Sequence, residues 1–178
     1  MMGKLKNIIE EQIEIVRRNG VPVIVNKQGT IEILNYSFNY LDDDFINTEE
    51  NYIDMLEYYK ENNINYEEIL KLEKDEYAKI TEGVVETFKK FDEDINTRQA
   101  IWVSPWCISM IHFIVRNNIL HCFVKLRSSD VVKLLISDMR LILELVRKLQ
   151  EKLNIKNVFV NVNIDSAHII VIEDITKI

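Results

Sequence analysis

Glycine, proline, cysteine and histidine are all scarce in this chain of 178 residues. With only 4 glycines and 2 prolines there is little material for linkers, so we expect a single domain over residues 1–178. The 2 cysteines, Cys107 and Cys122, and the 3 histidines lack the short spacings of a zinc site, so no bound metal is expected. No secretory signal precedes them, and both cysteines are expected to be free thiols in a reducing cytosol.

Long hydrophobic runs and an excess of positive charge are also missing. No apolar segment reaches the roughly 20 residues that a membrane-spanning helix needs, so we expect a cytoplasmic protein without a membrane partner. The net charge of −7 argues against nucleic acid as a partner, because broad nucleic-acid binding needs a basic surface. A few local arginines are enough to hold one phosphate, so a small phosphorylated ligand stays open.

The first forty residues predict a helix followed by a β-hairpin. Apolar residues recur at helical spacing from Lys4 to Arg18, and Asn19-Gly20 is predicted to end the helix because glycine suits the left-handed conformation. Val21–Val25 and residues 30–40 have strand-like patterns, with a turn predicted at residues 27–29. We expect this hairpin to be structural and to lie at the edge of a sheet.

The acidic middle of the chain predicts helices. Thr48 is a candidate cap for a helix over residues 51–60, and a shorter helix is predicted over residues 66–72. A further helical stripe runs from Tyr77 to Phe91. Its aromatic side chains are expected to lie in the core rather than to form a ligand platform.

The second half of the chain returns to strands around one long helix. The predicted elements are strands at 100–103, 110–115, 119–126, 158–164 and 166–172, and a helix at 130–153. Asn117-Asn118 forms the turn between two of these strands. The order of elements predicts a mixed α/β fold of the α+β kind, in which helices pack on a mixed, largely antiparallel sheet.

Cys107 and Arg127 are the residues that first suggest chemistry. A cysteine beside Trp106 and Ile108 is usually a small buried hydrophobe, and that interpretation stays open. A nucleophilic thiol instead needs its pKa lowered by a nearby positive charge. Arg127 supplies that charge if the two predicted strands pair, and together with Ser128 it has donors suited to a phosphate. The alternative for any such arginine is a solvated surface charge.

One segment, from Trp106 to Asp138, carries functional residue types at fixed spacing. Cys107 is followed by His112-Phe113, then by Arg127-Ser128-Ser129-Asp130, and Asp138 comes eight residues later. Further short matches are Thr97-Arg98-Gln99-Ala100, Ser166-Ala167-His168 and, more weakly, Gly29 to Tyr36. This pattern resembles the active-site region of the thymidylate synthase family, which includes the deoxycytidylate hydroxymethylases. The resemblance covers about half of the chain and implies a thymidylate-synthase-like fold.

The resemblance implies a pyrimidine-nucleotide one-carbon transferase, either a methyltransferase or a hydroxymethyltransferase. Cys107 would attack carbon 6 of a pyrimidine nucleoside monophosphate, and carbon 5 would receive a one-carbon unit from 5,10-methylenetetrahydrofolate. Arg127 and Ser128 would hold the 5′-phosphate, Asp130 would position the base through its backbone, and His168 would contact the sugar hydroxyl.

The resemblance also implies a homodimer and a preferred base. Family members are dimers in which the arginine that matches Arg98 reaches the phosphate bound by the other subunit. Asp138 stands where the family has an asparagine that contacts uracil. An ionised carboxylate only accepts hydrogen bonds, which suits the amino group of cytosine and favours cytidylate over deoxyuridylate. A simple helix-start role for Asp138 is the alternative.

Departures from the family pattern keep a second function open. The altered positions are Trp106, Ile108, His112, Leu134, Ile136 and Ile170. The catalytic glutamate of the family has no clear match, and Glu49 and Glu50 are the nearest candidates. The C-terminal segment that closes over folate in the family also has no match. The second function is a catalytically degenerate nucleotide-binding or structural dimer subunit.

Overall fold

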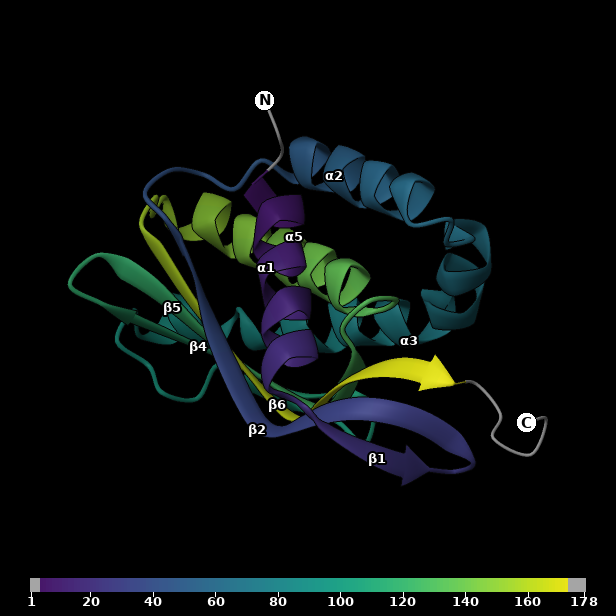
Figure 1. Ribbon diagram of the computed structural model, residues 1–178. Coiled ribbons are helices and arrows are strands. Elements are labelled where there is room, and N and C mark those ends of the chain that lie inside the picture. The colour runs from purple at the N-terminus through teal and green to yellow at the C-terminus, as the bar shows by residue number, and fades with distance from the viewer. Residues whose placement is uncertain (1–3, 173–178) are drawn as a thin grey trace.

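The computed structural model describes residues 4–172, apart from the side chains of Leu72, Glu73 and Ile172. The elements are α1 (Lys4–Asn19), β1 (Val21–Val25), β2 (Gln28–Asp42), α2 (Thr48–Glu61), α3 (Tyr66–Thr87), α4 (Lys90–Glu93), β3 (Ile101–Val103), β4 (Ile108–Arg116), β5 (Ile119–Asp130), α5 (Leu135–Leu153) and β6 (Val158–Ile172). The strands form one six-stranded sheet in the order β1-β2-β6-β5-β4-β3. Helices α1, α3 and α5 cover one face of it, and α2 lies over α1 and α5 (Figure 1).

The predicted mixed, largely antiparallel sheet packed by helices is confirmed. Every neighbouring pair of strands is antiparallel except β5 and β6, which run parallel. A parallel pair needs a long crossover connection, and here that connection is α5. The predicted edge hairpin is also confirmed, because β1 lies at one end of the sheet and pairs with β2.

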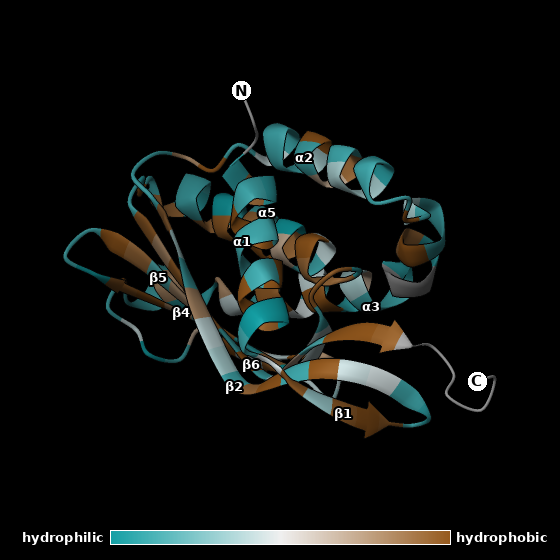
Figure 2. Ribbon diagram, in the orientation of Figure 1, coloured by the Kyte–Doolittle hydropathy of each residue, from teal (hydrophilic) through white to brown (hydrophobic). Residues whose placement is uncertain are grey.

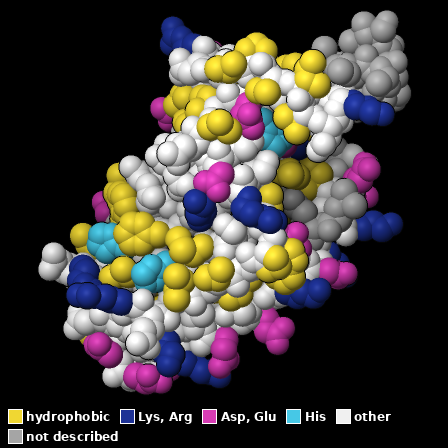
Figure 3. Space-filling model, turned by 90° about the horizontal axis from the view of Figure 1, so that it is seen from below, with side chains coloured by type: hydrophobic (Ala, Val, Ile, Leu, Met, Phe, Trp, Pro, Cys, Tyr) yellow, Lys and Arg dark blue, Asp and Glu magenta, His cyan; other side chains and the backbone are white. Residues whose placement is uncertain are grey.

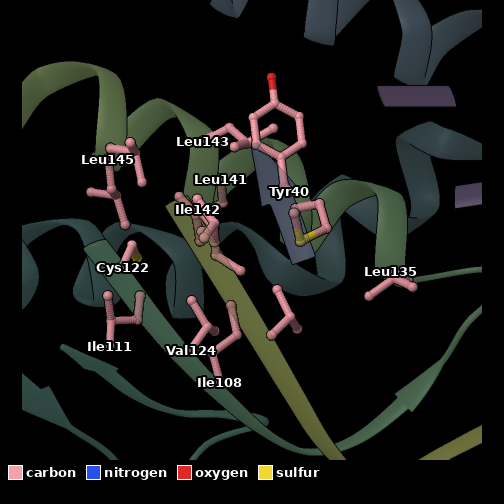
Figure 4. Packing of buried hydrophobic residues seen from close by; sticks show 14 of the residues in the cluster. Tyr40, Ile108, Ile111, Cys122, Val124, Leu135, Leu141, Ile142, Leu143 and Leu145 are labelled. Atoms are coloured by element: carbon pink, nitrogen blue, oxygen red, sulfur yellow. The ribbon is translucent and has the colours of Figure 1, made fainter. Parts of the chain in front are cut away.

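The core lies between the sheet and the helical layer. Hydrophobic residues of α5, among them Leu141, Ile142 and Leu145, lie over Ile111 of β4 and Cys122 of β5 (Figure 4). Figure 2 shows that the helices carry hydrophilic residues on their outer sides. Fully burying one such aliphatic side chain contributes about 1.5–3 kcal/mol, so this layer dominates stability. None of the helices in the described part of the chain has an apolar stretch long enough to cross a membrane.

The helices differ from the sequence-based predictions at their ends. Asn47, not Thr48, caps α2, because its side chain accepts a hydrogen bond from the backbone N–H of Glu50. The two helices predicted between residues 66 and 91 are one helix, α3, followed by the short α4. The predicted core role of the aromatic stripe is correct, since Tyr77, Phe88 and Phe91 are buried.

The hairpin turn is shorter than predicted and begins one residue earlier. β1 ends at Val25 and β2 begins at Gln28, and the two residues between them, Asn26 and Lys27, both have positive φ. This is the backbone that a two-residue hairpin loop requires. Gly20 does not adopt the predicted left-handed conformation. Glycine is needed there because a Cβ would lie 2.5 Å from a methyl carbon of Ile31.

Side-chain alternation changes phase along one line across the sheet. The Cα pairing of β2 with β6 passes from Leu34–Ser166 to Tyr36–Ile164, so it skips Asn35 and Asp165. The pairing of β5 with β6 likewise skips Arg127. Buried residues on β6 are even-numbered up to Ile164 and odd-numbered from Ala167 to Ile169. Successive side chains of a strand point to opposite faces, so this shift of one residue exchanges the two faces in the C-terminal parts of β5 and β6. Even-numbered side chains, which point into the core before the shift, point away from it afterwards.

The phase change explains three wrong boundaries. The predicted strands 158–164 and 166–172 are one strand, β6, with the irregularity at Asp165. β5 continues through Arg127 to Asp130 instead of ending at Leu126. The following helix therefore starts at Leu135 rather than at Asp130, after a turn over residues 131–134.

Asp54 ties the N-terminal helix to α2. Its carboxylate accepts hydrogen bonds from the backbone N–H groups of Leu5 and Lys6, at 3.0 and 3.2 Å. These are donors of the first turn of α1, which have no partner within the helix. Asp54 is 3% exposed, so the cap is shielded from water.

We expect Asp54→Ala to lower the free energy of unfolding by about 1–3 kcal/mol, because it leaves buried N–H donors without acceptors. Urea denaturation measures this as a lower midpoint with an unchanged slope. Glu57→Ala removes an exposed carboxylate from the same helix and should change the stability by less than about 0.5 kcal/mol. Equal effects of the two substitutions would contradict the capping role.

Candidate functional site

Cys107 lies in a pocket of about 600 Å³. Ser128, Asp130 and His168, which were predicted from the sequence to act with Cys107, line the same pocket. The rest of the wall comes from the connection between α2 and α3, from the turn before α5 and from the end of β6, as Asn63, Ile64, Asn65, Glu68, Ile69, Lys133, Leu134 and Ile170. Four of the predicted site residues, which are up to 61 positions apart in the sequence (168 − 107), therefore meet at one pocket.

Hydrogen bonds link these polar side chains. The Cys107 thiol donates to the backbone carbonyl oxygen of Ser128, with 2.7 Å between Sγ and O. The Ser128 hydroxyl lies 3.4 Å from Nδ1 of His168. Both Ser128 and His168 follow the phase change in their strands, which is why they point away from the hydrophobic core.

Asp130 shapes the wall of the pocket. Its Oδ1 accepts from the backbone N–H groups of Val132 and Lys133, at 3.1 and 3.2 Å, so it holds the turn that precedes α5. Helix α2 anchors the same turn, because the hydroxyl groups of Tyr58 and Tyr59 donate to the carbonyl oxygens of Val132 and Lys133. Asp130 is therefore both a lining residue and the cap of the adjoining turn.

Arg127 lies beside Cys107 but does not line its pocket. Its backbone N–H donates to the carbonyl oxygen of Cys107, and its Nε donates to that of Trp106, both at 2.9 Å. The predicted strand pairing that brings Arg127 to Cys107 is therefore confirmed. The side chain itself is exposed and holds the segment before β4, so its placement differs from that of a pocket-lining phosphate clamp.

Burial raises the pKa of the Cys107 thiol above its ordinary value, and the negative charge of Asp138 raises it further. The hydrogen bond to Ser128 and the positive charge of Arg127 lower it, but they are outweighed. The charge of Arg127 therefore acts on the thiol in the direction expected from the sequence, but the pKa of Cys107 is raised on balance. The expectation of free thiols is confirmed for both cysteines, and burial raises the pKa of Cys122 as well.

Asp138 is held inside the protein rather than at the pocket surface. It is 5% exposed and lies in the first turn of α5. The hydroxyl of Tyr77 donates to its Oδ1 at 2.8 Å and also lies 3.1 Å from the hydroxyl of Ser137. Asp138 thus acts on Cys107 through its charge. The hydrophobic pattern of the sequence did not reveal the hydrogen bond between Tyr77 and Asp138.

The remaining candidates lie elsewhere. Arg98 lines a separate, open pocket with Arg116, and its carbonyl oxygen lies 3.0 Å from Nε2 of His112. Glu49 lines a third pocket, between α2 and α5. Glu50 belongs to the cap of α2, where its side chain accepts from Asn47. Neither glutamate is brought to Cys107.

Sequence reasoning missed the part of the wall between α2 and α3. Asn63, Asn65 and Glu68 line the pocket although they precede Cys107 by about forty residues. Nothing in their local pattern differs from an ordinary helix connection. Lys133 was also missed, and its signal was its position three residues after Asp130, within the turn that Asp130 caps.

We expect Asp138→Asn to speed the alkylation of Cys107 by iodoacetamide at pH 8, because removing the negative charge lowers the thiol pKa and increases the thiolate fraction. Arg127→Gln should slow it for the opposite reason. Mass spectrometry of the modified peptide gives both rates, and Cys122, which is fully buried, should stay unmodified in the folded protein. A slower reaction in Asp138→Asn would contradict this account of the thiol.

Comparisons with known proteins identify no family for this chain. Neither a scan against protein-family models nor a search of curated proteins found a match. The description of the site therefore rests on the residues themselves, above all on the convergence of Cys107, Ser128 and His168.

Proposed function

We propose that the protein is a pyrimidine-nucleotide one-carbon transferase that acts at ring carbon 5 through a covalent bond to Cys107. The observation that carries the proposal is that Cys107, Ser128, Asp130 and His168 line one pocket. Its volume of about 600 Å³ lies in the usual range for small-molecule sites. The free thiols suit the cytoplasmic location that we include in the proposal.

In the proposed reaction, the thiolate of Cys107 bonds to carbon 6 of the ring, and the electron pair of the 5,6 double bond moves to carbon 5. Carbon 5 then bonds to the one-carbon unit and loses its proton. Departure of the thiolate restores the double bond and frees Cys107. The raised pKa means that Cys107 must lose its proton to a base when the substrate binds, and His168, in the same pocket, is the candidate acceptor.

The apolar part of the pocket wall suits the proposed one-carbon donor. Ile64, Ile69 and Leu134 add aliphatic surface to the same pocket, and a flat pterin ring would pack against such a surface. When bound, 5,10-methylenetetrahydrofolate would supply the one-carbon unit, whose bond to the folate nitrogen must break. Addition of water to the transferred carbon would give a hydroxymethyl product, and a hydride from the tetrahydrofolate would give a methyl product. This donor remains part of the proposal.

Cytidylate is the proposed base class. Asp138 is an acceptor when ionised, and its charge reaches Cys107, the atom that would bond to the ring. The amino group of cytosine donates, whereas uracil presents a carbonyl oxygen at the same position, so a carboxylate that contacts the base favours cytosine. Asp138, which Tyr77 holds inside the protein, would have to turn toward the pocket to make this contact. Ser128 would contact the phosphate together with Arg127, whose exposed side chain would have to turn toward the ligand.

A homodimer is also part of the proposal, and the uncovered face of the sheet supports it. No helix in the described part of the chain covers this face, where hydrophobic side chains gather around histidines (Figure 3). Cross-strand pairs place His112 beside Phe123, and His121 beside Phe159. His121 and Phe123 are stacked, with 6.2 Å between ring centroids. Exposed apolar surface of this kind marks interaction sites.

The dimer would give Arg98 its proposed role. Arg98 lies just before β3, at the edge of this face, and does not line the Cys107 pocket of its own chain. An arginine in that position is suited to reach the phosphate of a second subunit. The neighbouring exposed residues Ile101 and Val103 extend the apolar surface to the sheet edge.

Loss of the carbon 5 proton of cytidylate in deuterated water, followed by nuclear magnetic resonance, tests the covalent step. We expect exchange with the wild-type protein and none above background with Cys107→Ser, because only the thiolate adduct makes carbon 5 exchangeable. Cys122→Ala, in the core, should retain exchange. Absence of exchange with both cytidylate and uridylate in the wild type would overturn the catalytic proposal.

Sedimentation equilibrium tests the dimer. We expect a mass of twice the 21.1 kDa chain for the wild type and a shift toward monomer for Phe123→Glu, because a charge in an apolar interface is costly to desolvate. Ile53→Glu is the matched control, since Ile53 is an exposed apolar residue on α2. Circular dichroism checks that both variants fold, and a monomeric wild type would contradict the dimer.

The second candidate function is a nucleotide-binding subunit without catalysis. The raised pKa of Cys107 favours it, because a mostly protonated thiol is a weak nucleophile. Calorimetric titration separates the two functions. Nucleotide binding without carbon 5 exchange supports the non-catalytic subunit, and the absence of binding supports a purely structural role.

A further inference from the structure

A second, smaller pocket adjoins the Cys107 pocket. Its volume is about 190 Å³, and it shares Ser128 and His168 with the larger one. The rest of its wall comes from β6 and the β1–β2 hairpin, as Val25, Asn26, Gln28, Thr30, Glu32 and Ser166. The space suits one small ring rather than a whole nucleotide, so it is a side chamber of the same site.

The lining of this side pocket is polar and carries a carboxylate. It offers hydroxyls, amides, an imidazole and the carboxylate of Glu32, and no lysine or arginine is among the described residues that line it. A phosphate placed there would meet the negative charge of Glu32 without a cation to balance it. A neutral group rich in hydroxyls fits the lining, because it can donate to Glu32 and exchange hydrogen bonds with the serines.

Glu32 is placed to receive such donors. It is the cross-strand partner of His168, so the two side chains lie on the same face of the sheet. The Ser166 hydroxyl donates to Oε1 of Glu32, which orients the carboxylate. An ionised carboxylate has about four acceptor positions, so it can accept from a ligand while it accepts from Ser166.

We propose that the side pocket is the sugar subsite of the Cys107 site and that Glu32 selects ribonucleotides over deoxyribonucleotides. Acidic side chains recognise ribose in dinucleotide-binding proteins by accepting from its 2′-hydroxyl. Ribose presents two adjacent hydroxyl donors to Glu32, whereas deoxyribose presents one. This inference rests on the proposed nucleotide function and narrows its substrate class to cytidine 5′-monophosphate and related ribonucleotides.

Calorimetric titration with cytidine 5′-monophosphate and deoxycytidine 5′-monophosphate tests the inference. We expect the wild type to bind the ribonucleotide roughly tenfold or more tightly, as one hydrogen bond to a charged group allows. Glu32→Gln should reduce this ratio, and Glu32→Ala should bring it close to one. Glu67→Gln removes an exposed carboxylate of α3 that lines neither pocket and should leave the ratio unchanged.

The outcomes separate the inference from the function on which it rests. A wild type that binds both nucleotides equally, or Glu32 variants that keep the wild-type ratio, would overturn the role of Glu32 and leave the nucleotide site in place. A wild type that binds neither nucleotide would overturn the proposed function, and the inference with it. Thermal melting of each variant establishes that a changed ratio comes from a folded protein.

Discussion

The change in side-chain phase across β2, β6 and β5 is the constraint on which the site depends. On one side of the line through Asn35, Asp165 and Arg127, which holds residues 36–42 of β2, 158–164 of β6 and 119–126 of β5, the buried side chains belong to even-numbered residues. Beyond that line the buried side of the strand carries Ser129 and Ala167, and Ser128 and His168 turn outward. A shift of one residue moves a whole set of side chains to the other face. Without it, Ser128 and His168 would point into the core.

The helical layer supports the wall of the pocket that the sheet does not form. Tyr58 and Tyr59 of α2 hold the turn before α5, and Asp130 caps that turn from within β5. Tyr58 and Tyr59 also belong to the hydrophobic core, so the packing of α2 against α5 supports the wall beside Cys107. The same arrangement buries the thiol and brings Asp138 near it, which raises the pKa of Cys107. Covalent chemistry at Cys107 would therefore depend on whether a bound ligand lowers the pKa of the thiol.

Local patterns identified most elements and misplaced several of their ends. The amphipathic spacing of α1 and α5 and the alternation in β4 and β5 were sufficient, because apolar side chains recur with the period of each structure. The ends failed where long-range contacts decide. The pairing of β6 with both β2 and β5 carries that strand past Asp165. The start of α1 at Lys4 was predicted correctly, but its cap by Asp54 of another helix was not. No residue near Leu5 or Asp165 signals these partners.

The sequence by itself indicated candidate site residues along one continuous segment, from Cys107 through Arg127-Ser128 to Asp138, because spacing along a strand pair and a following helix is local information. It also determined the mixed, largely antiparallel sheet. Only the tertiary structure decided which side chains face the pocket. It turned Arg127 outward, held Asp138 against Tyr77, and placed Glu32 beside His168. These outcomes depend on strand register and helix packing, which join residues far apart in the chain.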